Sequence, residues 1–237
     1  MLKRITPLFI KNFLKRIINF FTYSPWANIY HSQNGEDIIL KYLFFKKKKG
    51  FYVDVGAHHP ERFSNTHLLY KKGWNGINID AMPGCIKLFN KLRPRDINLE
   101  LGIGKKNEII NFYVFNESAI NTFSKEQAEK MNNSKNEFFL KKVAKVKVKR
   151  LETVLKNYLS ENEIDLLNID VEGLDLDVLE SNDWSKYRPK FVLVEILDCV
   201  FDDLAKSPVV KFMREKEYTI YSKQINTVFF KNNLSRD

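Results

Sequence analysis

The chain has 237 residues, of which 44% are hydrophobic and 14% aromatic, and its formal net charge is +10. This length fits one α/β domain with extensions, and this composition excludes a wholly disordered chain. The two cysteines, Cys85 and Cys199, show no metal-binding spacing and no disulfide framework, so they favour a reducing compartment such as the cytosol.

Residues 1–22 are predicted to form a basic amphipathic helix. This segment contains lysine and arginine but no acidic residue, and its apolar residues recur at helical spacing. Charges interrupt every apolar stretch, which excludes a secretory signal and a membrane-spanning helix. The helix can lie on an anionic membrane surface, or it can dock on its own domain or on a second subunit. The sequence leaves these choices open.

A polar cluster, His31–Asp37, follows a short linker and leads into an apolar helix. An Asp or Asn before a helix is ordinarily a cap, but so many polar groups also suit the lip of a ligand site. The run Lys46–Lys49 is interpreted as a solvated surface. We predict a boundary after residue 22 and one domain over residues 23–237.

Two apolar strands with acidic residues near their ends form the centre of this domain. The strand over residues 51–55 contains Asp54 and stops at Gly56-Ala57, a turn typical of the step from a buried parallel strand to a helix. The strand over residues 76–80 ends on Asp80. This unit of strand, glycine turn, helix and strand with a terminal carboxylate can hold a nucleoside, although an ordinary core strand with an incidental Asp would look similar.

The rest of the chain repeats the order strand then helix. Residues 116–142 are polar and weakly patterned, which is typical of a lid or substrate loop. Lys141–Arg150 alternates Lys with Val, as an exposed edge strand would. We predict helices over residues 38–45, 67–72, 83–92, 151–159 and 209–216 and after Gly173 to about 181, and strands over 51–55, 76–80, 96–103, 111–115, 164–170, 191–195, 217–222 and 227–231.

This order predicts a parallel sheet with helices on both faces. Four of its buried strands end on or near an acid, namely Asp54, Asp80, Asp170 and Glu195. Because ligands of such sheets bind beyond the carboxyl ends of the strands, these acids are expected to meet in one crevice. Helix capping alone does not account for four of them.

An ordered set of short motifs resembles the FkbM-type S-adenosylmethionine-dependent methyltransferases. The similarity runs from about Ser32 to Phe230, and each motif is weak while the ordered set is specific. The motifs are Ser32-Gln33-x-Gly35-Glu36-Asp37, Asp54-Val-Gly-Ala57, Ser64-Asn-Thr66, Gly73-Trp74-x-Gly76, Asn78-Ile-Asp80 and Asp170-Val-Glu-Gly173.

The resemblance implies a Rossmann-like class I methyltransferase fold, a seven-stranded, mostly parallel sheet whose last strand is antiparallel. It implies S-adenosylmethionine as methyl donor and a hydroxyl acceptor, often on a sugar, in surface polysaccharide biosynthesis. Many class I enzymes have a second glycine in the first turn, whereas here His58-His59-Pro60 follows. By position, the residues implied to hold the methyl donor are Gln33, Asp54, Gly56, Ala57, Asn65, Asp80 and Met82.

A sugar hydroxyl must lose its proton as the methyl group arrives, and a histidine or a carboxylate can accept that proton. Candidate catalytic residues are therefore His58, His59, Asp170 and Glu172. A divalent ion would instead lower the pKa of the hydroxyl. Asp170, Glu195 and Asp198 are candidate ligands for Mg²⁺ or Mn²⁺, which prefer oxygen. Alternatively, Asp170 and Glu172 orient substrate hydroxyls, and the histidines are structural.

The sequence thus predicts a cytoplasmic O-methyltransferase, placed at the inner face of the membrane if residues 1–22 bind there. Its acceptor would be a sugar, a nucleotide-sugar or a lipid-linked glycan, and a second copy of the chain is a further candidate partner. The basic charge suggests a nucleic-acid methyltransferase as the alternative, but no aromatic and basic residues interleave as in an RNA-binding module, and no specific nucleic acid is expected. A non-catalytic cofactor-binding or membrane-docking protein is the other alternative.

Overall fold

The computed structural model describes residues 28–117, 120–133, 137–159, 163–197 and 200–235. The chain divides into two units, Met1–Tyr30 and His31–Asp237, and the fold below is that of the second. The helix predicted at residues 1–22 and the candidate ligand Asp198 lie outside the described residues. No helix in the described part of the chain is long and apolar enough to cross a membrane.

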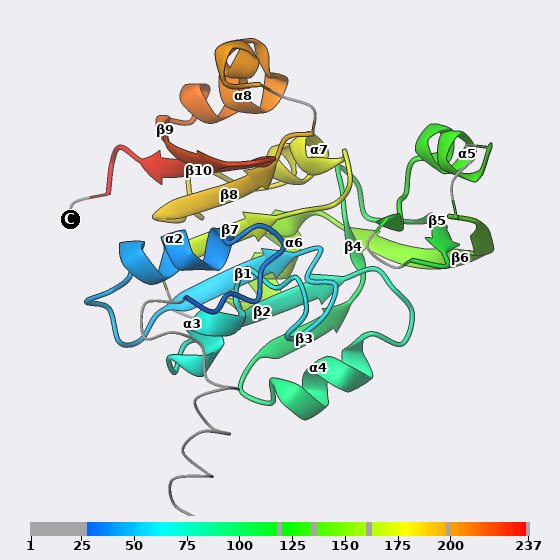
Figure 1. Cartoon of the computed structure of the whole chain (residues 1–237), viewed down its shortest axis with the longest axis horizontal. Coiled ribbons are helices and arrows are strands. Elements are labelled where there is room, and N and C mark those ends of the chain that lie inside the picture. The colour runs from blue at the N-terminus through cyan, green and yellow to red at the C-terminus, as the bar shows by residue number, and fades with distance from the viewer. Residues whose placement is uncertain (1–27, 118–119, 134–136, 160–162, 198–199, 236–237) are drawn as a thin grey trace, which may run out of the picture. The chain divides into compact units, whose positions relative to one another are not determined.

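A seven-stranded sheet with the order β3-β2-β1-β7-β8-β10-β9 forms the centre of the unit (Figure 1). All neighbours from β3 to β8 are parallel, whereas β10 is antiparallel to both β8 and β9. The predicted sheet with an antiparallel last strand is confirmed. Its strands are β1 (Phe51–Val55), β2 (Asn75–Asp80), β3 (Ile97–Glu100), β7 (Leu166–Ile169), β8 (Phe191–Glu195), β9 (Tyr218–Gln224) and β10 (Thr227–Asn232).

Helices cover both faces of this sheet. Successive residues of a strand point to opposite faces, so Val53 packs in one core and Tyr52 in the other. The core around Tyr52 includes side chains of α2 (Glu36–Leu43) and α3 (His67–Lys71). The core around Val53 includes side chains of α6 (Leu151–Tyr158), α7 (Asp175–Glu180), the 3-10 helix η2 (Phe201–Lys206) and α8 (Pro208–Glu215). A further helix, α4 (Ile86–Leu92), connects β2 to β3.

Close strand packing explains one glycine of the sheet. Gly76 lies opposite Tyr52 in the β1–β2 register. A Cβ atom at Gly76 would lie 2.2 Å from the carbonyl oxygen of Tyr52. This position therefore admits no side chain without moving β1 away from β2.

A second sheet of three strands, β4-β6-β5, stands beside the first (Figure 1). Its strands are β4 (Gly102–Ile103), β5 (Glu108–Phe115) and β6 (Leu140–Lys149). The single strand predicted over residues 96–103 is thus two, because β3 pairs with β2 and β4 pairs with β6.

The prediction of an edge strand over residues 141–150 was wrong, since β6 is the middle strand of this sheet. However, β4 pairs only with Val148 and Lys149, so the start of β6 has one neighbouring strand, β5, and keeps the exposed lysines of an edge. The weakly patterned segment 116–142 also contains a helix, α5 (Lys125–Asn133).

Candidate active site

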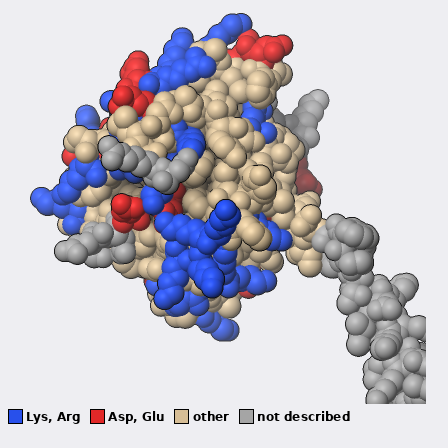
Figure 2. Space-filling model, turned by 90° about the vertical axis from the view of Figure 1, so that its left-hand side faces the viewer, with Lys and Arg blue, Asp and Glu red and all other residues tan. Residues whose placement is uncertain are grey.

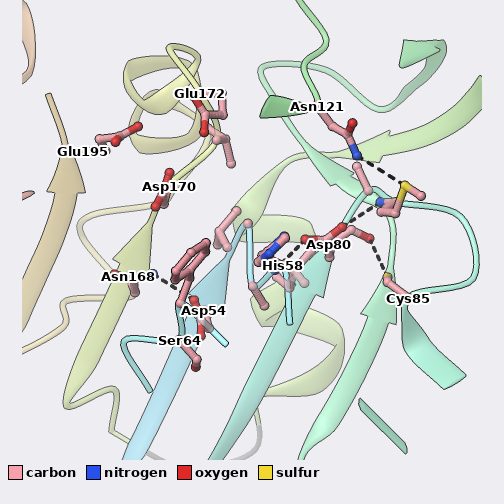
Figure 3. Close-up of a pocket in the computed structure, with 18 of the residues that line it drawn as sticks. Asp54, His58, Ser64, Asp80, Cys85, Asn121, Asn168, Asp170, Glu172 and Glu195 are labelled. Atoms are coloured by element: carbon pink, nitrogen blue, oxygen red, sulfur yellow. Dashed lines mark hydrogen bonds between the residues drawn. The ribbon is translucent and has the colours of Figure 1, made fainter. Parts of the chain in front are cut away.

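A cavity of about 460 Å³ opens at the carboxyl ends of the parallel strands (Figure 3). Asp54, Asp80, Asp170 and Glu195, which belong to or directly follow the adjacent strands β1, β2, β7 and β8, all line it. The prediction that these four acids meet in one crevice is confirmed. A pocket of this size and position is where an open α/β sheet binds its ligand.

The turn after β1 is held by both neighbouring strands. Gly56 has a φ of 80°, and its backbone N–H and that of Ala57 donate to the carbonyl oxygen of Ile79 at 2.9 and 3.1 Å. A Cβ atom at Gly56 would lie 1.7 Å from the carbonyl oxygen of Asp170. Only glycine fits here, because the turn needs a left-handed conformation and packs directly on the residue that follows β7.

Backbone groups fix the carboxylate of Asp80 at the end of β2. One oxygen accepts a hydrogen bond from the N–H of His58 and the other from the N–H of Met82, both at 2.7 Å. Burial raises the pKa of Asp80, and the two N–H donors oppose that rise. The carboxylate is thereby held against the cavity with further acceptor capacity on each oxygen.

The two histidines of this turn have different surroundings. The His58 side chain lines the cavity, and its Nε2 is buried without a partner in the described part of the chain. Burial, followed by the charges of Arg62 and His59, lowers the pKa of His58. His59 does not line the cavity, and its Nδ1 accepts the backbone N–H groups of Glu61 and Arg62 at 3.0 Å. Of the two, His58 is the imidazole that lines the cavity.

Three acids gather beyond β7 and β8. Asp170, Glu172 and Glu195 each place a carboxylate oxygen within 4.8 Å of the others, on the left of Figure 3. Burial, the Asp170 charge and the Asp175 charge raise the pKa of Glu172 to about 8. Burial also raises the pKa of both Asp170 and Glu195, and the other acids raise that of Glu195 further. Burial and the proximity of the other acids thus raise the pKa of all three carboxyl groups.

The opposite end of the cavity is apolar. Phe112 of β5 and Phe123 of the following loop lie with ring centroids 4.6 Å apart, and Leu101 and Ile103 also line the cavity. The Asn121 amide donates to the sulfur of Met82 at 3.3 Å (Figure 3). The small sheet thus supplies an apolar slot beside Asp80. Residues 121–124 belong to the segment 116–142, which was predicted to be a lid or substrate loop, but none of them was predicted as a site residue.

A polar network forms part of the cavity wall and extends into the protein behind it. The Asp54 carboxylate accepts hydrogen bonds from the Thr66 hydroxyl at 2.6 Å and from the Asn168 amide at 2.9 Å. Asn168 in turn accepts a bond from the Asn65 amide at 2.9 Å. Burial raises the pKa of Asp54, while these bonds and nearby Arg93 oppose the rise. Asp54 therefore shapes the site through its neighbours.

Arg93 is a second residue of this network, besides Asn168, that was not predicted from the sequence. It is 1% exposed. Its guanidinium donates to the carbonyl oxygen of Pro60, to the hydroxyls of Ser64 and Thr66, and to the amide oxygen of Asn78. One buried arginine thus ties the loop after β1 to β2. No local motif marks it, because all these partners are distant in sequence.

Most predicted site residues reach the cavity. The polar cluster His31–Asp37 reaches into α2, whose N-cap is Gly35 with no side-chain cap hydrogen bond, so the interpretation of an Asp or Asn cap was wrong. Ser32 and Asp37 bond to each other at 2.9 Å, while Gln33 and Glu36 line the cavity. The lining includes the predicted Gln33, Asp54, Gly56, Ala57, His58, Asn65, Asp80, Met82, Asp170, Glu172 and Glu195 and, unpredicted, Cys85, Asn121, Asn168 and Thr227.

Comparison with known proteins identifies a family. A model of the family described as the methyltransferase FkbM domain matches residues 54–220. No curated protein matches the chain. Among solved structures, a TehB-like SAM-dependent methyltransferase from Corynebacterium glutamicum ATCC 13032 Kitasato is similar, with 11% sequence identity and a TM-score of 0.40, over 96% of this chain and 100% of that chain.

Proposed function

The chain belongs to the FkbM methyltransferase family, and we propose that it transfers a methyl group from S-adenosylmethionine to a hydroxyl of a sugar, a nucleotide-sugar or a lipid-linked glycan. Family membership makes it an S-adenosylmethionine-dependent methyltransferase. The observation that carries the finer proposal is the cluster of Asp170, Glu172 and Glu195, which gathers three carboxyl groups at one end of the cavity.

The cavity residues fit S-adenosylmethionine, which supplies an activated methyl group on a sulfonium centre. In the proposal Asp80 accepts the ribose hydroxyls, and the slot of Met82 and its apolar neighbours takes the adenine. Gln33 and Asn65 bind the methionine end, and the turn at Gly56 and Ala57 lies beneath it. The buried, unpartnered Nε2 of His58 supports a polar ligand at this turn.

The acid cluster supports an alcohol acceptor. A hydroxyl must lose its proton as it attacks, and a base is most effective when its pKa lies near the working pH. The pKa of Glu172 is raised to about 8 by burial and by the neighbouring acids. In the proposal Asp170 or Glu172 accepts the proton, and His58, whose lowered pKa keeps it neutral, is the second candidate base.

The same cluster argues for a saccharide and against nucleic acid. Carboxylates accept hydrogen bonds from several sugar hydroxyls at once, whereas they repel the phosphates of an RNA strand. We place the reaction in the cytoplasm, where a free thiol such as Cys85 stays reduced.

The first experiment measures transfer of a labelled methyl group from S-adenosylmethionine to monosaccharides, nucleotide-sugars, lipid-linked saccharides and total RNA. We expect label on a saccharide oxygen and none on RNA. Asp170→Asn should lower turnover about a hundredfold or more while the calorimetric affinity for S-adenosylmethionine stays within a few fold. Glu129→Gln, an exposed change on α5, is the control.

Label on RNA alone would replace this proposal by the nucleic-acid alternative, and binding without turnover on any acceptor would favour a non-catalytic role. Divalent-ion dependence is decided by the same assay after treatment with EDTA. Activity that is lost and then restored by Mg²⁺ or Mn²⁺ would make the acid cluster a cation site. Activity that survives leaves proton acceptance to the side chains themselves, Asp170, Glu172 or His58.

A further inference from the structure

We propose that the end of α2 and the loop after it form a docking surface for an anionic lipid bilayer. We define this aromatic–lysine patch as Lys41, Tyr42, Phe45, Lys46, Lys48 and Lys49, all of which are exposed. It lies where β1 begins and therefore at the opposite end of the sheet from the cavity. This inference does not depend on the identity of the methyl acceptor.

The two aromatic side chains are the first observation. Tyr42 is 76% exposed and Phe45 is 74% exposed, the highest values among the large hydrophobic side chains in the described ranges. Phe45 N–H donates to the carbonyl oxygen of Tyr42 at 3.1 Å, so one turn of chain presents both rings. Exposed aromatic rings at the tip of a turn suit insertion at the boundary between headgroups and acyl chains.

The turn that carries these rings is held firmly. The Lys72 ammonium, which follows α3, donates to the carbonyl oxygens of Phe44 and Phe45. Phe44 itself is buried, with its ring centroid 4.7 Å from that of Trp74. The exposed rings therefore stand on an anchored turn, which reduces the conformational entropy lost on docking.

Charge supplies the second observation. Between Ile38 and Pro60 the only acid is Asp54, which is buried at the far end of β1. Lys47 pairs with buried Asp165, but no ion pair is found for Lys46, Lys48 or Lys49 within the described residues. Figure 2 views the side of the molecule at which the parallel strands begin and shows lysine and arginine side chains gathered there.

The positive charges of the patch indicate which partner docks on it. The amphipathic segment at residues 1–22 also carries only positive charges, so docking of this segment on the patch would bring like charges together. An anionic bilayer complements the positive charge of both the patch and this segment. Its interface accommodates the aromatic rings, and its headgroups attract the lysines. Each lysine near such a surface strengthens binding about fivefold, because its attraction is on the order of 1 kcal/mol.

The test is co-sedimentation of the full chain with vesicles of phosphatidylcholine containing phosphatidylglycerol, and with vesicles of phosphatidylcholine alone. We expect binding only to the anionic vesicles, weakening as salt rises. The triple change Lys46→Gln, Lys48→Gln and Lys49→Gln should lower the partition coefficient about a hundredfold. Tyr42→Ser with Phe45→Ser should lower it about tenfold or more.

Two controls carry changes of the same kind elsewhere, three lysines in one and a single aromatic ring in the other. Lys141→Gln, Lys145→Gln and Lys147→Gln remove three exposed lysines of β6, and Phe201→Ser removes a ring that is 70% exposed beside Asp202 and Asp203. Neither should change the partition coefficient more than about threefold. Equal losses in patch and control variants, no binding by the parent chain, or patch-dependent binding to an RNA oligomer in place of vesicles would overturn the proposal.

Discussion

Two polar regions of the site, one buried around Asp54 and one half-buried around Asp170, differ in their hydrogen bonding. In the buried network, each oxygen of Asp54 accepts at least one hydrogen bond, and Arg93 donates to four residues. Asp96, which follows α4, extends this network, since its two oxygens accept from the Tyr52 hydroxyl, the Gly76 N–H and the Asn78 amide. In the acid cluster, the three carboxylates face one another, and Glu195 has a buried oxygen without a partner among the described residues.

This difference distinguishes polar groups that stabilise the fold from polar groups that serve the reaction. A buried polar group that has its hydrogen bonds costs little and fixes the fold, whereas like charges without compensation destabilise the folded state. Such uncompensated groups gather where a ligand or a reaction supplies what is missing. Changes in the network should therefore lower stability, and changes in the acid cluster should raise stability and lower turnover.

Arg93→Met tests the network and should have the largest effect. It leaves the Asn78 amide oxygen without its Arg93 donor, takes two donors from the carbonyl oxygen of Pro60, which keeps only His67 Nδ1, and removes a positive charge that favours ionised Asp54, so we expect a loss of about 4 kcal/mol in the free energy of unfolding. Urea unfolding followed by circular dichroism at pH 7 measures it.

Arg95→Met is the matched control. Arg95 is exposed, donates to the carbonyl oxygen of Tyr70 at 2.6 Å and stacks on its ring, so its loss should cost about 1 kcal/mol. If the Arg93→Met protein does not fold, Arg93→Lys replaces it, because lysine keeps the positive charge but lacks the planar set of guanidinium donors. Arg93→Lys should still lower the free energy of unfolding more than Arg95→Met does. Equal losses at the two positions would mean that the network does not stabilise the fold.

Glu172→Gln tests the acid cluster and should have an intermediate effect of opposite sign. The folded-state pKa of Glu172 is about 8 and its ordinary value is 4.5. Between these values the folded state binds more protons than the unfolded state, so the stability of the parent chain falls as pH rises through this window. Removing the titrating group should add about 2 kcal/mol at pH 8, after allowance for solvent screening, and nothing at pH 4.5.

Thermal unfolding in EDTA at the two pH values measures this difference. Glu129→Gln, at an exposed position of α5, should change stability by less than about 0.5 kcal/mol at either pH. A Glu172→Gln protein that gains nothing at pH 8 would show that this carboxylate is not under electrostatic strain.

The same comparison shows which parts of the site could be predicted from the sequence alone. Asp80, Asp170 and Glu195 were predicted to converge because each ends a parallel strand or directly follows one, and the topology of such sheets brings their carboxyl ends together. Arg93 could not be predicted, since its partner Pro60 is far away in the chain. The pattern of the sequence shows which residues end a strand, but not which of them find hydrogen-bond donors.

The small sheet was harder to predict for another physical reason. The alternation of Lys and Val in β6 is expected both for a strand at an exposed edge and for a middle strand with one face in solvent. The pattern therefore does not identify the neighbouring strands. Helix α5 is polar on most sides and buries only Ala128, which leaves little apolar periodicity to detect. The apolar slot for a ligand depends on this sheet, and it therefore stayed outside the prediction.

Backbone strain in the acid cluster gives the smallest predicted effect. Glu172 has a φ of 55°, a left-handed conformation that residues with a Cβ rarely adopt. Glu172→Gly should therefore be about 1 kcal/mol more stable than Glu172→Gln, because both remove the charge and only glycine also removes the strain. Chemical denaturation at pH 5 and at pH 8 should give the same difference, since no titrating group remains at this position.

Glu217 is the control that separates the effect of backbone strain from the effect of the neighbouring acids. It follows α8 with a φ of 64° and is exposed away from the cavity, so Glu217→Gly should also exceed Glu217→Gln by about 1 kcal/mol. Only at Glu172 should the Gln variant be more stable than the parent chain at pH 8, because only there do neighbouring acids oppose the negative charge. A Gly advantage at Glu217 without one at Glu172 would show that contacts in the cavity hold the strained turn, and strain would then no longer distinguish the acid cluster from the network.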